Sequence, residues 1–180
     1  MADYDVVLLI EQELSASDAR QVRSLHEGLD DPVTYHVLLP LEDAAARLEA
    51  SMGSLSAGDM MGSSTMSMRG VDDLDAVRKE CEERTSRELS ATVASLEAAG
   101  ATLGSSGVAT DPPIEALAAK VAEVDGREAI ILTRPHVVAE FFHLDWTSQA
   151  RRKIGVPVLH LLEHENFDEQ AGGGEGVTGA

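Results

Sequence analysis

Short apolar runs alternate with longer amphipathic segments along most of this chain. Val6–Ile10 is an uninterrupted apolar run rich in β-branched residues, which is the pattern of a strand buried on both faces of a sheet. Similar runs, one of them interrupted by glycines, recur further along the chain. Together they predict strands at about residues 4–10, 33–39, 101–109, 128–133 and 156–162.

Helical periodicity fills the intervals between these runs. It is strongest over 72–99, where apolar residues recur at helical spacing with charged residues between them. Ser15 or Ser17 can cap a helix over 17–28, and Asp111 is a candidate capping carboxylate before the prolines that open a helix ending near Val124. One or two helical turns are expected in 41–50 and a helix in 145–153.

Strands that alternate with helices predict a three-layer α/β domain, in which an open parallel sheet has helices on both faces. Such a sheet binds its ligands at the carboxyl ends of the strands, at the point where the strand order reverses. The periodicity alone does not say which strands flank that point. We expect the domain to span residues 1–164.

Two segments break the alternation. Residues 51–70 contain four glycines, six serines and five methionines without a period, which predicts a mobile loop. Residues 165–180 are acidic and rich in glycine, which predicts a flexible tail.

Charge narrows the choice of partners. The chain has 32 acidic and 14 basic residues, a formal net charge of −18. Nucleic acids and anionic membrane surfaces both attract basic proteins, so this balance argues against either partner. The lone cysteine, Cys81, falls in the apolar stripe of the predicted long helix and cannot form an internal disulfide. A reducing compartment fits this cysteine count, and the first apolar run is too short for a signal peptide, so we expect a cytoplasmic protein.

Several segments resemble the universal stress protein family. Ile10-Glu11 lies where the family ends its first strand with Val-Asp, and 34–37 (Thr-Tyr-His-Val) resembles its second strand. Residues 110–117 resemble its "GDP-x-x-x-I" helix start, 129–132 its apolar fourth strand, and 156–159 its final "PVLVV" strand. The resemblance covers about residues 4–163.

The resemblance implies more than the periodicity does. It implies a strand order of 3-2-1-4-5, the adenine nucleotide alpha-hydrolase-like arrangement, with a crevice between strands one and four. It also implies a homodimer that often forms through the last strands of two subunits. Many members bind ATP, and some regulate or signal rather than catalyse.

The family's phosphate loop is missing from this sequence. ATP-binding members have G-x-x-G, nine residues and then G-[ST] after the fourth strand, so that backbone amides can reach the phosphates. Here the first part reads Thr133-Arg134-Pro135-His136, and its proline removes an amide donor. Asp145-Trp146-Thr147-Ser148 stands near the second part. We therefore expect no cofactor, and ATP is possible but disfavoured.

Some polar residues still mark the expected crevice. Arg134 could offer its planar guanidinium to an anion, and Thr147 and Ser148 would sit near a helix start. Alternatively, Arg134 pairs with a surface acid and Thr147 only caps a helix. The candidate ligand-binding residues are Glu11, His36, Thr133, Arg134, His136, Thr147 and Ser148.

The sequence predicts no metal site and no catalytic residues. His136, Glu140 and His143 could share a helical face and hold zinc, but the segment suits a packed turn equally well. The methionines of 51–70 could bind copper, although methionine more often serves as adaptable packing.

These patterns favour a dimeric, non-enzymatic module that binds a ligand or partner in a stress response. One alternative is a nucleotide binder, for ATP or AMP, with an unconventional phosphate site at the end of strand four. Another is a small-molecule enzyme of unknown reaction.

Overall fold

The computed structural model describes residues 4–41, 66–133 and 152–162, and only the backbone of 66–74. The helical turns expected within 42–50, most of the helix expected at 145–153 and the tail at 165–180 lie outside the described residues. So does the predicted loop as far as residue 65.

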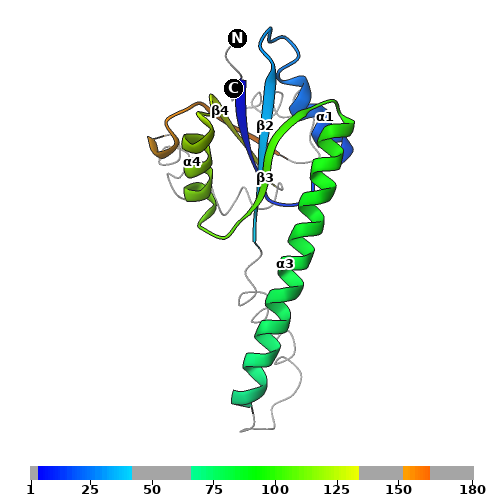
Figure 1. Ribbon diagram of the computed structural model, residues 1–180, viewed down its shortest axis with the longest axis vertical. Helices are drawn as coiled ribbons and strands as arrows, with labels where there is room; N and C mark the ends of the chain where they lie inside the picture. The colour runs from blue at the N-terminus through cyan, green and yellow to red at the C-terminus, as the bar shows by residue number, and fades with distance from the viewer. Residues whose placement is uncertain (1–3, 42–65, 134–151, 163–180) are drawn as a thin grey trace, which may run out of the picture. The chain divides into compact units, whose positions relative to one another are not determined.

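The predicted sheet is confirmed, and its strand order is the one that the resemblance implied. Five strands run parallel in the order β3-β2-β1-β4-β5, so β1 occupies the centre and β3 and β5 the edges (Figure 1). The strands are β1 (Tyr4–Ile10), β2 (Val33–Pro40), β3 (Thr102–Ala109), β4 (Glu128–Thr133) and β5 (Val158–Leu162).

Local signals explain where most of the helices begin and end, with three corrections. The first helix ends at Ser24, before the predicted end at Gly28, and residues 25–28 form turns. The helices are α1 (Ala16–Ser24), α3 (Met66–Ala98) and α4 (Pro113–Val124). Ser15 caps α1 by accepting a hydrogen bond from the Asp18 amide at 3.2 Å. The capping role predicted for Asp111 is wrong, because Pro112 occupies the N-cap of α4 and no side chain bonds there. The start predicted for α3 is late, because the helix already includes 66–70, the end of the expected loop.

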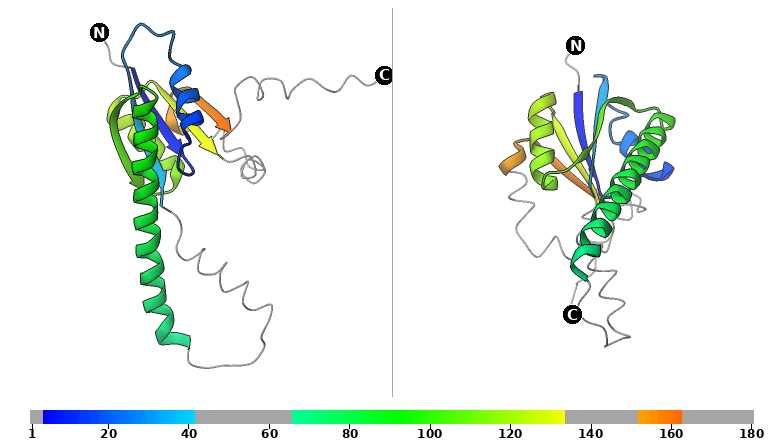
Figure 2. Two further views of the ribbon diagram at one scale, coloured as in Figure 1. Left: turned by 90° about the vertical axis from the view of Figure 1, so that its right-hand side faces the viewer. Right: turned by 60° about the horizontal axis from the view of Figure 1, so that its bottom comes forward.

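Two apolar layers hold the helices on opposite faces of the sheet (Figure 2). Val6, Leu8 and Ile10 of β1 face the layer that contains α1 and the C-terminal turns of α3. Val7 and Leu9 face the layer that contains α4. All five are buried, and each stabilises the fold by roughly 1.5–3 kcal/mol. This gives the predicted three-layer α/β architecture.

The chain divides into two compact units, Met1–Pro40 with Glu88–Ala180, and Leu41–Arg87. The first contains the sheet. In the second, Cys81 and Thr85 are buried one helical turn apart on α3, as the apolar stripe predicted for Cys81. Within the described parts of the chain, no helix is long and apolar enough to cross a lipid bilayer.

Candidate functional site

The strand order reverses at the carboxyl ends of β1 and β4. β2 and β3 lie to one side of β1, and β4 and β5 lie to the other. Ile10 is the register partner of Leu132, and the Glu11 amide donates to the Leu132 carbonyl at 3.2 Å. Glu11 therefore lies opposite Thr133, at the position where an open parallel sheet binds ligands.

The loop that carries Glu11 is fixed at its far end. The Leu14 amide donates to Thr92 Oγ1 of α3 at 3.0 Å, and both residues are buried. Ser15 then caps α1. Residues 11–15 are thus tied to α1 and α3 as well as to the sheet. The sequence did not single out Thr92, because nothing in its pattern distinguishes it from the other polar residues within α3.

Thr133 meets a histidine that the sequence left without a role in ligand binding. Thr133 Oγ1 and His160 Nε2 of β5 are 2.8 Å apart, and Thr133 is buried. Burial lowers the pKa of His160, so its ring is neutral at pH 7. A neutral ring can donate or accept at either nitrogen, according to its tautomer. The carboxyl end of the sheet therefore offers a carboxylate, a hydroxyl and a neutral imidazole.

The other candidate residues do not join this group in the described structure. Arg134, His136, Thr147 and Ser148 lie outside the described residues, as does the possible zinc trio with Glu140 and His143. Within the ranges that the structure does describe, no group of three acidic, histidine or cysteine side chains could hold a metal ion.

His36 lies in the middle of β2. Its register partner on β1 is Val7, which precedes Glu11 by four residues, about 13 Å along an extended strand. Both ring nitrogens have partners, because Nε2 lies 2.9 Å from Asp5 Oδ1 and Nδ1 lies 2.8 Å from Ser105 Oγ. His36 is therefore separate from the carboxyl ends of β1 and β4, where Glu11 and Thr133 lie.

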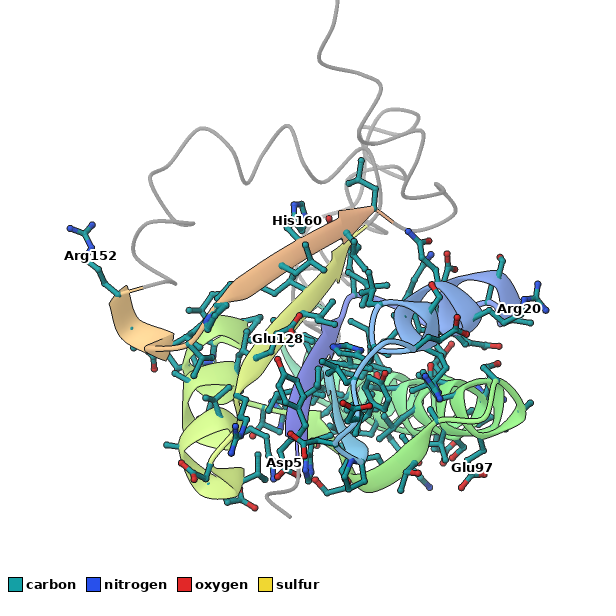
Figure 3. The ribbon with its side chains drawn as sticks, turned by 90° about the horizontal axis from the view of Figure 1, so that it is seen from above. Asp5, Arg20, Glu97, Glu128, Arg152 and His160 are labelled. Carbon is teal, nitrogen blue, oxygen red and sulfur yellow. The ribbon has the colours of Figure 1, made fainter. Side chains whose placement is uncertain are left out.

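The amino ends of the strands hold a second histidine, on the other face of the sheet. His26 Nδ1 lies 2.8 Å from the Tyr35 hydroxyl, and His26 Nε2 lies 3.4 Å from Glu128 Oε2. Tyr4 also donates to Glu128, at 3.1 Å. Figure 3 looks onto this end of the sheet, with Glu128 labelled on β4 and Asp5 on β1.

This network shifts the ionisation of its members. The hydrogen bond from His26 is the main reason why the pKa of Glu128 is lowered. Burial raises the pKa of Tyr35 to about 12. A cavity of about 210 Å³ lies beside His26, and Arg23, Glu27 and Asp31 also line it. Because both signs of charge line this cavity, neither an anion nor a cation is clearly favoured there.

Comparison with known proteins shows which of them share the fold of this chain. No protein-family model and no curated protein matches this sequence. A universal stress protein from Archaeoglobus fulgidus is similar in structure, with a TM-score of 0.51 and 14% identity, over 87% of this chain and 92% of that chain. A universal stress protein family protein from Arabidopsis thaliana, solved with AMP bound, has a TM-score of 0.51 and 12% identity, over 92% and 94% of the two chains. The identity is too low to show more than architecture, and the chain therefore has the fold of the universal stress proteins.

Proposed function

We propose that this chain is a stress-response module that acts by binding a ligand or protein partner at the crevice between β1 and β4. The observation that carries the proposal is the hydrogen bond from the Glu11 amide to the Leu132 carbonyl, which holds Glu11 beside the end of β4 at the reversal of strand order. The bond from Leu14 to Thr92 supports it, because a fixed loop spends little conformational entropy when a ligand binds. The proposal includes a cytoplasmic location, and the net charge of −18 speaks against nucleic acid as the partner.

Mass spectrometry under non-denaturing conditions tests this binding on protein purified directly from cells. The wild-type protein is expected to carry an additional small-molecule or protein mass. Thr133→Val removes the crevice hydroxyl and should reduce that occupancy at least about tenfold, the loss expected for one buried hydrogen bond. Thr102→Val, at an exposed position of β3, is the matched control and should retain it. A bare chain in every preparation, or equal occupancy in both variants, contradicts the proposal.

ATP is not expected to be a tight ligand. The residues after Thr133 are Arg134, Pro135 and His136, and a phosphate loop needs several free amides with no side chains in the way. Losing those charge-assisted hydrogen bonds weakens binding by orders of magnitude. Calorimetry should give a Kd for ATP no tighter than about 100 μM, or about −5.5 kcal/mol. A micromolar constant contradicts this expectation.

An adenine nucleotide bound through an unconventional phosphate site is the second candidate. The specific observation in its favour is the AMP in the Arabidopsis protein, which has the same fold. Arg134 would then replace the glycine loop with a bidentate contact to a phosphate. A micromolar Kd for AMP or ATP that Arg134→Ala abolishes would make this the better account.

A homodimer through β5 completes the proposal. β5 is an edge strand with mostly apolar, partly exposed residues, and such an edge favours pairing with another strand. Val158→Lys should give monomeric or insoluble protein, whereas sedimentation of the unmodified protein should give a dimer. A monomeric wild-type protein contradicts this part.

A further inference from the structure

Three neighbouring strands bring a carboxylate, an imidazole and a hydroxyl into one hydrogen-bonded chain. Asp5 of β1, His36 of β2 and Ser105 of β3 lie on the face of the sheet that α4 covers. The two distances are 2.9 Å from Asp5 Oδ1 to His36 Nε2 and 2.8 Å from His36 Nδ1 to Ser105 Oγ. The hydroxyl stands at the outer end, because β3 is the edge strand.

Asp5 decides which nitrogen of the ring carries the proton. An ionised carboxylate only accepts hydrogen bonds, so this contact favours the tautomer of the His36 ring that donates from Nε2. Nδ1 is then a lone-pair acceptor, and it faces the Ser105 hydroxyl. Ser105 therefore donates its hydroxyl proton to a ring that a carboxylate orients, which is the arrangement that activates serine nucleophiles.

The backbone of β3 is adapted to this contact. The ladder between β2 and β3 shifts register, so that Tyr35 pairs with Leu103 but His36 pairs with Ser105, and Gly104 is the additional residue. A Cβ on Gly104 would clash with Cε1 of the His36 ring, and it would stand 2.9 Å from His36 Nδ1 and 2.8 Å from Thr34 Cγ2. The glycine thus leaves the space in which the ring reaches across to Ser105. Bulges of this kind re-aim side chains and are common beside active sites.

The exposure of Ser105 distinguishes it from a serine with a purely structural role. His36 is buried, whereas Ser105 is only half-buried on the outermost strand. Ser105 is thus the more exposed end of the chain of hydrogen bonds, and the base behind it is closed to solvent.

We propose that Ser105 is the nucleophile of an acyl-transfer site, with His36 as its general base and Asp5 as the positioning residue. The substrate class is a small, uncharged carboxylic ester, because the net charge of −18 repels anions. This site is separate from the crevice of β1 and β4 and does not depend on the binding function proposed there.

The reaction balances with water as the second reactant. Ser105 Oγ forms a bond to the ester carbonyl carbon, and its proton passes to His36 Nδ1. The carbon–oxygen bond to the leaving alcohol breaks, and that alkoxide takes the proton from His36. Water then attacks the acyl-serine with His36 again as base, which releases the carboxylic acid and restores the hydroxyl.

An alkyl fluorophosphonate tests the nucleophile directly on the full-length chain. Its phosphorus bonds to the serine oxygen, fluoride leaves, and the proton goes to His36. Intact-mass and peptide analysis should find one label, on Ser105. Ser105→Ala should abolish the label. Ser106→Ala is the matched control and should keep it, because Ser106 is the exposed neighbour and pairs with Val37 instead of a histidine.

Two further variants separate activation from structure. His36→Gln and Asp5→Asn should each slow labelling at least about tenfold, in line with triads on other folds. With p-nitrophenyl acetate, Asp5→Asn should lower kcat while KM stays within about twofold, a split that loss of structure alone does not produce. Circular dichroism melts of each variant check that the domain is folded.

Three results would overturn the proposal. They are absence of a label on the folded wild-type protein, a label that persists in Ser105→Ala, and equal labelling rates for the wild type and Asp5→Asn. The third would mean that His36 and Asp5 only join the strands and do not activate the hydroxyl.

Discussion

Two histidines are buried in the described part of the sheet domain, and they have the same kinds of neighbours but opposite surroundings. His26 bridges Glu128 and the Tyr35 hydroxyl, and His36 bridges Asp5 and the Ser105 hydroxyl. The first hydroxyl is completely buried, with 0% of Tyr35 exposed, and the second lies half-buried on the edge strand. The same three chemical groups therefore make a stabilising core contact in one place and a reachable nucleophile in the other.

Burial also changes the acidity of the Tyr35 hydroxyl. Burial raises the pKa of Tyr35 to about 12, so its hydroxyl keeps its proton and remains a hydrogen-bond donor. A donor that never reacts and never meets water contributes only to stability. The predictions below therefore set stability at His26 against reactivity at His36.

The largest expected loss of stability comes from His26→Ala. It leaves the Tyr35 hydroxyl without its partner, leaves Glu128 with only the hydrogen bond from Tyr4, and opens a cavity, so the free energy of unfolding should fall by roughly 2–4 kcal/mol. His36→Ala should cost less, roughly 1–2 kcal/mol, because Asp5 and Ser105 are partly exposed and can turn to water. Urea denaturation measures both, and a larger loss for His36→Ala would reverse the comparison.

Gly104→Ala should have the next largest effect, because overpacking should lower the free energy of unfolding by roughly 1–3 kcal/mol. The new methyl group meets the His36 ring and Thr34, so the ring must move away from Ser105. The rate of fluorophosphonate labelling at Ser105 should also fall, because the displaced ring no longer accepts the Ser105 proton. Gly107→Ala on the same strand is the control, because a Cβ there has no heavy atom within 4 Å. Equal denaturation midpoints for the two variants would show that the His36 ring can move to accommodate the methyl group without loss of stability.

Removing one hydroxyl from each histidine gives a smaller effect. Tyr35→Phe deletes a buried hydrogen bond to His26 Nδ1 and should cost roughly 1–2 kcal/mol. Ser105→Ala removes a half-buried hydroxyl and should change stability by no more than about 0.5 kcal/mol. Thermal or chemical melts that rank Ser105→Ala as the more damaging change would contradict the assigned roles.

The smallest effect is in the pH dependence of stability at Glu128. Its pKa in the folded protein is lowered from 4.5, first of all by the hydrogen bond from His26. In this pH range the unfolded state binds more protons than the folded state. The contribution of ionised Glu128 to the free energy of unfolding is therefore complete above about pH 4.5, and it is lost as the pH falls through the lower pKa of the folded protein. The advantage of wild type over Glu128→Gln should shrink between pH 5 and the acid limit of urea titrations. A constant difference would mean that His26 does not stabilise the ionised carboxylate.

The apolar runs were sufficient to predict the central strands β1, β2 and β4, because a strand buried on both faces has few alternatives in sequence. The strand order required the family resemblance, since periodicity carries no information about neighbours. Ser15 was found as a cap from its type and position, whereas Asp111 was not a cap because Pro112 takes that place. Cap type is a preference that local backbone geometry can override.

The Asp5–His36–Ser105 chain was beyond sequence reasoning. His36 is 31 residues from Asp5 and 69 from Ser105, and the contact depends on strand register. The bulge at Gly104 changes which face Ser105 occupies, and a glycine within a strand run is only a weak signal of a bulge. At the crevice, Glu11 and Thr133 were predictable because both directly follow or end apolar runs, but His160 required the pairing of β4 with β5.

The central position of β1 has a consequence for how the chain folds as it is synthesised. β1 can pair with β2 once residue 40 has emerged, yet its other edge pairs with β4, which begins at Glu128. Through the synthesis of the intervening segment, the central strand of the sheet has one open edge. Non-local parallel pairing forms slowly, and unpaired edges are where nascent chains aggregate. The insertion of β4 beside β1 is therefore the step that covers the second edge of β1.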